Sequence, residues 1–174
     1  MAGPSFSIRI AALNNERGTK LLWTAKDIEL YLQEQPYIDT AILPLVPASF
    51  GREMKQSASQ YEWIRLLSTS LENQFKGRLV LMPAYMYLQS LGPEMNREVL
   101  QKWESEMAAG GFRHIFYITS DPVWQPCQTS LEGSIIWLPA IPLAHMEQKY
   151  RDTVVEEQVK QLISLIVNQW QETL

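Results

Sequence analysis

Apolar positions along most of the chain follow two repeats, and these repeats predict helices alternating with buried strands. In the helical stretches apolar side chains recur every three or four residues, which gives a helix one buried face. The first helix begins at Thr24, with Asp27 three residues later as in a capping box, and Pro36 stops it. The other helices are predicted at Met54–Phe75, Met95–Ala109 and about His145–Trp170.

Short apolar runs separate these helices, as is typical of strands buried on both faces of a parallel sheet. Pro44 predicts that the first strand ends early, near Leu43, because proline cannot donate a ladder hydrogen bond. The predicted strands are Ile38–Val46, Arg78–Met82, His114–Thr119 and Ser134–Leu138.

Buried strands separated by helices indicate right-handed βαβ crossovers and an α/β fold. We predict a three-layer α/β/α sandwich of Rossmann-like type, with a mostly parallel sheet of about four strands. The segment Ser120–Gly133 is interpreted as a loop that is too short for a crossover helix. The fourth strand can therefore pair in either direction, and an antiparallel or edge placement fits it.

The first twenty residues differ from the rest. Phe6, Ile8 and Ile10 alternate with polar residues, which is a strand pattern, and a polar turn or linker follows them. Residues 1–20 are predicted to be an N-terminal extension or an edge strand. Residues 21–174 are predicted to form a single α/β domain.

Composition narrows the functional classes. The chain has 174 residues, of which 46% are hydrophobic and 20% charged, as in globular domains. The net charge of −4, the pI of about 5.2 and the absence of adjacent cations argue against nucleic-acid binding. The sequence contains no run of 18 apolar residues, so it predicts no membrane span. Cys127 is the single cysteine, so no intramolecular disulfide can form, and the protein is predicted to be cytoplasmic.

Six tryptophans are a high number for this length, and we interpret them mainly as core and core-margin residues. Exposed tryptophans would instead mark a partner surface. They are Trp23, Trp63, Trp103, Trp124, Trp137 and Trp170.

Three stretches together resemble a known family: residues 23–31 (WTAKDIELY), 37–41 (YIDTA) and 54–59 (MKQSAS). They are similar to the YpiF-like uncharacterised proteins of Bacillus-type bacteria. The resemblance covers about Leu21 to Trp170, which supports reading the first twenty residues as an extension. It implies a cytoplasmic bacterial protein. It brings no activity, cofactor or catalytic residue with it.

Ligands of parallel sheets bind beyond the carboxyl ends of the strands, so the loops that follow the strands are the candidate site. After the first strand, a helix N-terminus with Gly, Ser and two cations is suited to an anion. The loops after the second and third strands also bring Tyr87 and Thr119 to the crevice. The predicted ligand-binding residues are Ser49, Gly51, Arg52, Lys55, Tyr85, Ser120 and Asp121.

Each of these residues also has a structural interpretation. Ser49 then caps the helix, Gly51 turns the chain, Arg52 and Lys55 are solvated, and Asp121 closes an Asx-turn before a proline. No dinucleotide-binding or P-loop glycine motif occurs.

Other candidate groups favour structural roles. Cys127 and His145 lack a recognised nucleophile signature, so Cys127 is interpreted as a small buried hydrophobe and His114 as structural. No pair of ligands at short spacing predicts a metal site, and no cofactor is predicted. Four helical carboxylates are interpreted as solvated: Glu104, Glu106, Glu156 and Glu157.

Two hypotheses about function remain. We favour a non-enzymatic interaction or regulatory protein, with a protein partner or a homodimer, because no dense cluster of catalytic residue types appears. The alternative is a small-molecule or nucleotide-binding enzyme that uses the crevice at the carboxyl ends of the strands. An exposed Trp or Met patch would favour the first hypothesis. A deep pocket joining Arg52, Tyr85 and Asp121 would favour the second.

Overall fold

The computed structural model describes residues 20–35 and 37–172. The predicted strand pattern at Phe6–Ile10 and the predicted stop at Pro36 lie outside these residues. The helices are α2 (Ala25–Glu34), η2 (Gly51–Glu53), α3 (Met54–Phe75), η3 (Gln89–Leu91), α4 (Gly92–Ala109), η4 (Pro122–Ser130) and α5 (Gln148–Glu172), where η marks 3-10 helices. The strands are β1 (Thr40–Ala48), β2 (Val80–Leu81), β3 (Tyr85–Leu88), β4 (His114–Thr119) and β5 (Ser134–Trp137).

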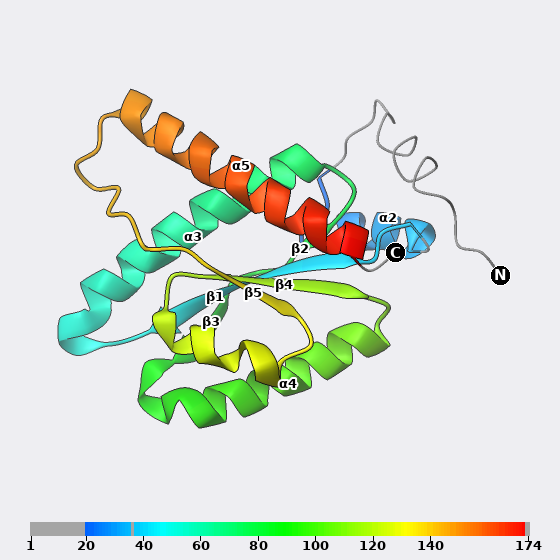
Figure 1. Ribbon diagram of the computed structural model, residues 1–174, viewed down its shortest axis with the longest axis horizontal. Coiled ribbons are helices and arrows are strands. Elements are labelled where there is room, and N and C mark those ends of the chain that lie inside the picture. The colour runs from blue at the N-terminus through cyan, green and yellow to red at the C-terminus, as the bar shows by residue number, and fades with distance from the viewer. Residues whose placement is uncertain (1–19, 36, 173–174) are drawn as a thin grey trace.

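The strands form one parallel sheet around β1. Its order is β2–β1–β4–β5, and β3 also pairs with β1, on the side opposite β4. Figure 1 shows α3 and α5 over one face, with α4 and η4 under the other. Alternate strand residues divide accordingly: Ile42 and Phe116 pack into one core, Leu43 and Tyr117 into the other. The predicted α/β sandwich with a mostly parallel sheet is confirmed.

β1 runs through Pro44 and Pro47, so the predicted end near Leu43 is wrong. The Met82 N–H donates to the Ile42 carbonyl at 2.9 Å, so even-numbered residues of β1 direct their backbone groups towards β2 and β3. Pro44 therefore faces the break between β2 and β3. Pro47 faces the other way, beyond the part of β1 that β4 pairs with. Each proline lies where the neighbouring ladder is already interrupted.

The connection between β4 and β5 was also predicted wrongly. It forms the nine-residue helix η4 instead of a loop, and β5 pairs parallel to β4. Of the two directions left open for this strand, the structure has the parallel one, and the placement at the sheet edge is confirmed. A 3-10 helix suffices as the crossover because β4 and β5 are neighbours. Trp124 and Cys127 anchor it in the core beneath the sheet.

β3 was not predicted as a strand. The sequence places one strand before Pro83, but β2 is only two residues long and β3 follows it. Tyr87 is buried, whereas Met86 and Leu88 on the opposite face of β3 are exposed. This alternation is typical of an edge strand with one covered face.

Helix boundaries agree closely with the sequence. The Asp27 N–H donates to the Thr24 side chain at 3.2 Å, which confirms the predicted start of α2. α3 spans the predicted residues, α4 begins earlier, at Gly92, and α5 begins later, at Gln148.

Several residues at the apolar spacing of the predicted helices are exposed instead of buried. They are Leu32, Met54, Tyr61, Trp103 and Tyr150. Among the tryptophans, Trp63 and Trp124 are fully buried, as predicted, whereas Trp23 is 57% and Trp103 44% exposed. Within the described ranges, no helix is long and apolar enough to cross a membrane.

Candidate functional site

Asp121 follows β4 at the carboxyl end of the sheet and is buried. The Tyr87 hydroxyl donates to its Oδ2 at 2.6 Å, and the Val123 N–H donates to its Oδ1 at 3.0 Å. The second bond closes the Asx-turn and makes Asp121 the N-cap of η4. The first bond links the carboxyl ends of β3 and β4 across β1.

Tyr87 is held in an apolar setting. Its ring meets the Trp124 ring edge-on, with centroids 5.1 Å apart. Burial raises the pKa of the Tyr87 phenol, and the Asp121 carboxylate raises it further. The hydroxyl therefore stays protonated at neutral pH and acts as a donor to Asp121, which makes it unsuitable as a general base.

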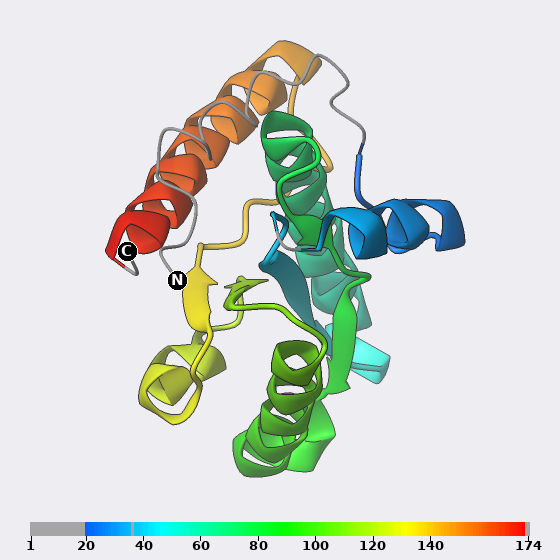
Figure 2. The same ribbon diagram turned by 90° about the vertical axis from the view of Figure 1, so that its right-hand side faces the viewer.

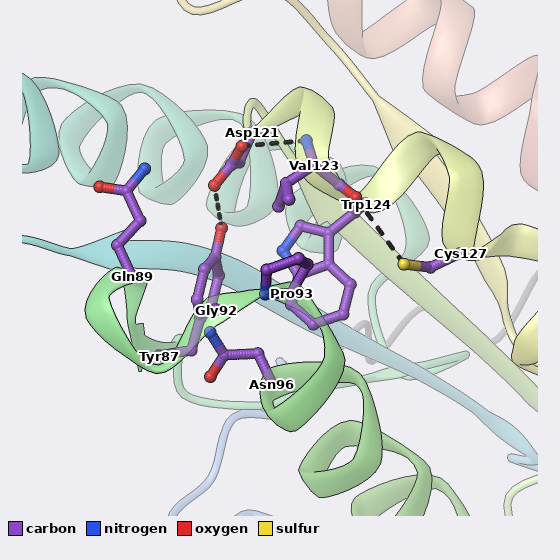
Figure 3. Close-up of a pocket in the computed structure, with 9 residues that line it drawn as sticks. All are labelled: Tyr87, Gln89, Gly92, Pro93, Asn96, Asp121, Val123, Trp124 and Cys127. Atoms are coloured by element: carbon purple, nitrogen blue, oxygen red, sulfur yellow. Dashed lines mark hydrogen bonds between the residues drawn. The ribbon is translucent and has the colours of Figure 1, made fainter.

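A cavity of about 60 Å³ lies beside this pair. The Trp124 indole N–H is directed towards Tyr87 and Asp121 in Figure 3. Against the larger rise that burial causes, it lowers the pKa of Tyr87 from nearby, but its geometry completes no hydrogen bond within the described residues. Neither does Asn96 Oδ1. The lining residues are Tyr87, Gln89, Gly92, Pro93, Asn96, Asp121, Val123, Trp124 and Cys127.

The size of the cavity limits what it can hold. Small-molecule sites usually enclose roughly 300–1,000 Å³. This cavity suits a few water-sized molecules, which would complete the hydrogen bonding of Asn96 and Trp124. A nucleotide or a sugar phosphate is too large for it.

Of the seven predicted ligand-binding residues, only Asp121 lines this cavity. Ser120 precedes it, and the Ser120 carbonyl accepts a hydrogen bond from the Trp137 indole at 3.2 Å. Tyr85 lies in β3, with its ring 6.2 Å from Tyr87 and 5.6 Å from Trp103 between centroids. Tyr85 thus belongs to the packing between β3 and α4.

Three of the other four predicted residues, Ser49, Gly51 and Arg52, lie on the connection between β1 and α3, and Lys55 lies in the first turn of α3. Gly51 has a φ of +78°, which explains the glycine at this turn. Arg52 and Lys55 are exposed. Ser49 does not cap α3: its N–H donates to the Ser57 hydroxyl at 3.4 Å. Ser57 also donates to the Pro47 carbonyl at 2.6 Å, so Ser57 fixes this connection.

The thiol and the imidazoles occupy different environments. Cys127 is buried in the cavity wall, and its Sγ donates to the Val123 carbonyl at 3.7 Å. His145 is exposed on the connection before α5, and His114 is half-buried at the start of β4. Across residues 20–35 and 37–172, no group of three or more His, Cys, Asp or Glu side chains is placed to hold a metal ion.

Glu104 was predicted to be solvated, and this is wrong. Its carboxylate is buried and accepts from the Tyr117 hydroxyl at 2.7 Å, from the Gly133 N–H at 2.8 Å and from the Glu132 N–H at 2.8 Å. Burial, and then Glu104 itself, raises the pKa of the Tyr117 phenol. The sequence held a signal, because Glu104 lies four residues after Leu100 on the buried face of α4. Glu106, Glu156 and Glu157 are exposed as predicted.

A second feature lies at the outer side of β3. Large apolar side chains on β3, and on the connections and first helical turns that follow β1 and β3, are roughly half exposed or more. Because β1 and β3 are paired from Leu45 to Ala48, these connections leave the sheet at one corner, where α3 and α4 begin (Figure 1). We call this group the β3 surface: Phe50, Met54, Met86, Leu88, Leu91 and Met95.

Comparison with known proteins matches the chain to a family. Residues 29–170 match the model of the protein family of unknown function DUF2487. The chain is also 30% identical over 148 residues to the uncharacterised protein YpiF of Bacillus subtilis (strain 168), covering 85% of this chain and 97% of the relative. The chain belongs to the DUF2487 family. The predicted resemblance to YpiF-like proteins is thereby confirmed.

The DUF2487 match includes the structural features described above. Residues 29–170 contain all five strands, the cavity and the β3 surface. No solved structure matches the chain. The family description assigns no function, so any role has to be argued from the geometry of these features.

Proposed function

We propose that this DUF2487 protein is a non-enzymatic interaction domain that binds a protein partner through the β3 surface. The observation that carries the proposal is the gathering of six exposed apolar side chains at one corner of the molecule. Contiguous apolar surface on a soluble domain usually marks an interaction site. Three of the six are methionines, whose flexible side chains adapt to different partner shapes.

The position of β3 at the sheet edge supports the same proposal. Edge strands carry unpaired backbone groups, and proteins commonly protect them with charges, prolines or covering elements. β3 carries no charged residue and no proline in its sequence, Tyr-Met-Tyr-Leu. An exposed apolar edge strand is instead the kind of surface to which partners add.

The setting we propose is the bacterial cytoplasm. The single cysteine supports a reducing compartment, and the Bacillus subtilis relative supports a bacterial origin.

Site-specific cross-linking in Bacillus cells tests the interaction domain. Leu88 is replaced by the photo-cross-linker benzoylphenylalanine, and Leu165 on α5, which is exposed to a similar degree, provides the matched control. We expect a discrete protein adduct from position 88 and none from position 165. Equal adducts from both positions, or none from position 88, would reject the β3 surface as a binding site.

Ligand binding at the carboxyl ends of the strands is the second candidate function. It is favoured by one observation, the two buried polar atoms of Asn96 and Trp124 that lack partners among the described residues. The predicted residues Ser49, Gly51, Arg52 and Lys55 would contribute only by extending this site.

Thermal melting with nucleotides, sugar phosphates, flavins and divalent metals tests the ligand-binding candidate. Because a nucleotide or a sugar phosphate is too large for the cavity alone, such a ligand would have to extend from it over the connection after β1. A ligand that binds the native state must raise the melting temperature by mass action. A shift that Asn96→Ala removes would favour ligand binding, and an unchanged melting temperature across the panel would argue against it.

A further inference from the structure

We propose that the partner on the β3 surface is a second copy of this chain. In this homodimer two β3 strands pair antiparallel around a two-fold axis, and two five-stranded sheets join into one. This inference rests on the proposed function, because it names the occupant of the same surface. Four features of β3 and its surroundings support it.

The backbone of β3 presents two residues to the outside. The backbone N–H and C=O groups of even-numbered β1 residues point towards β2 and β3. Because Val46 is paired with Met86, the backbone groups of Tyr85 and Tyr87 point towards β1. Met86 and Leu88 therefore direct their backbone groups outward. The Leu88 carbonyl fits this orientation, because it accepts a hydrogen bond from the Asn96 side chain at 2.9 Å, outside the sheet.

These two residues are placed symmetrically about Tyr87. A two-fold axis through Tyr87 sets Met86 opposite Leu88 of the other copy, so the two residues can exchange both backbone hydrogen bonds. The Leu88 carbonyl keeps a second lone pair for this bond. Met86 of each copy then lies opposite Leu88 of the other copy. The two pairs are related by the two-fold axis, as an isologous interface requires.

The helices beside β3 turn apolar flanks in the same direction. Met54 and Tyr61 share a flank of α3 with Glu72, because the positions are about two and about three turns apart. Glu72 accepts from the Leu21 N–H, and Leu21 lies along the outer side of β2, so this flank faces the open side of the sheet. On α4, Trp103 contacts Tyr85 of β3. Figure 2 shows β3 as the outermost strand on this side.

The exposed area matches what a stable dimer needs. Eight of the thirteen large apolar side chains that are exposed among the described residues belong to the β3 surface or to its flanks, Tyr61 and Trp103. They average about half exposure. At roughly 200 Å² for each fully exposed aromatic side chain, and less for Met and Leu, they leave at most on the order of 800 Å². Specific interfaces bury about 800 Å² on each partner. A second copy supplies an equal area with the same apolar character.

Sedimentation of the purified full-length chain tests the dimer between about 1 and about 200 µM, where mass action drives a weak dimer together. We expect a species of twice the 20.1 kDa chain mass. The double variant Met86→Glu, Leu88→Glu brings four carboxylates to the two-fold axis and should weaken dimerisation roughly 100-fold or more. Leu165→Glu adds a charge at an equally exposed apolar residue and should leave the dimer intact.

Amide hydrogen exchange provides a second readout that does not depend on the variants. In the wild-type protein the Met86 and Leu88 amides should be protected at high concentration and exchange freely at low concentration. A chain that remains monomeric at about 200 µM, or a dimer that the double variant leaves intact while its circular dichroism is native, overturns the proposal.

The two proposals fail in different ways. A monomeric chain whose position 88 cross-links to a different protein, identified by mass spectrometry, rejects the homodimer and keeps the interaction domain. A monomeric chain without any adduct at position 88 rejects both.

Discussion

β3 lies beside β2 at one edge of the sheet and β5 lies at the other, and the outward backbone groups of β3 and β5 are satisfied differently. At β5 the Gln128 side chain takes the place of a neighbouring peptide group. Its Nε2 donates to the Gly133 carbonyl at 3.0 Å, and its Oε1 accepts from the Ile135 N–H at 2.7 Å. One side chain thus satisfies two outward backbone groups in the pattern of a parallel ladder.

At β3 the corresponding side chain is Asn96, and it completes only half of this pattern. Its amide donates to the Leu88 carbonyl, but its Oδ1 has no partner among residues 20–35 and 37–172. The side chains next to β3 are large and apolar. The difference teaches that a side-chain amide satisfies two outward backbone groups at β5 but only one at β3. An edge left open in this way is a functional candidate.

Gly133→Ala should have the largest effect on the β5 side. A Cβ at Gly133 would lie 2.7 Å from the Tyr117 ring, 2.9 Å from the Ile115 carbonyl and 3.0 Å from Glu104 Oε2. We expect a loss of about 3 kcal/mol in the free energy of unfolding, measured with urea. Gly110→Ala, where the nearest atoms are at 3.4 Å, is the control and should change it little. Equal losses would show that space at Gly133 is not limiting.

Glu104→Gln should have the next largest effect. The buried carboxylate accepts from Tyr117 and from two backbone N–H groups before β5, and an amide replaces one acceptor oxygen with a donor. We expect a loss of about 2 kcal/mol in the free energy of unfolding. Glu106→Gln, on the exposed side of the same helix, should change it by less than about 0.5 kcal/mol. A stable Glu104→Gln protein would mean that the start of β5 is held by other contacts.

Gln128→Ala should make the β5 edge resemble the β3 edge. We expect a loss of about 1 kcal/mol in stability, because the groups that Gln128 releases are partly exposed. The Ile135 amide should exchange faster, and sedimentation should show new self-association that Met86→Glu, Leu88→Glu does not remove. Gln125→Ala, in the groove beside the same strand, is the control. Unchanged exchange at Ile135 would contradict the role given to Gln128.

The smallest effect concerns Leu21, which covers the outer side of β2 and is held there by Glu72. Its Oε1 accepts from the Leu21 N–H at 3.1 Å, and the Leu21 carbonyl accepts from the Leu81 N–H. Burial raises the pKa of Glu72 above its ordinary value of 4.5. The folded state then binds this proton more tightly than the unfolded state. This contribution to stability is full below the ordinary pKa and is lost as the pH rises through the raised value.

Glu72→Gln should remove this pH dependence and be at least as stable as the wild type above neutral pH. Urea unfolding at acidic and at mildly alkaline pH measures the difference, with exposed Glu62→Gln on the same helix as the control. A Glu72→Gln protein that is less stable than the wild type at alkaline pH would show that the ionised carboxylate stabilises the cover.

Local patterns predicted most elements because the interactions that form them are local. The boundaries of α3 and β4 follow from an apolar stripe and an apolar run, each ended by a turn residue. The site was harder to predict. Asp121 was identified by its place after a predicted strand, with an Asx-turn as its structural interpretation, and the structure adds Tyr87 as its donor from β3. Asn96 and Trp124 were not predicted as site residues, because a local sequence pattern does not show which buried polar atoms lack a hydrogen-bond partner.

The sequence by itself determined the α/β class, the parallel sheet and most helix boundaries, since hydrophobic period and turn chemistry act within a few residues. The tertiary structure decided which positions are edges. Pro44 is tolerated because β1 faces a gap there, and Glu104 is buried because the turn before β5 brings two N–H groups to it. Met86 and Leu88 are exposed because, among the described residues, β3 pairs only with β1. Pairing between distant segments, which no local pattern encodes, made each of these choices.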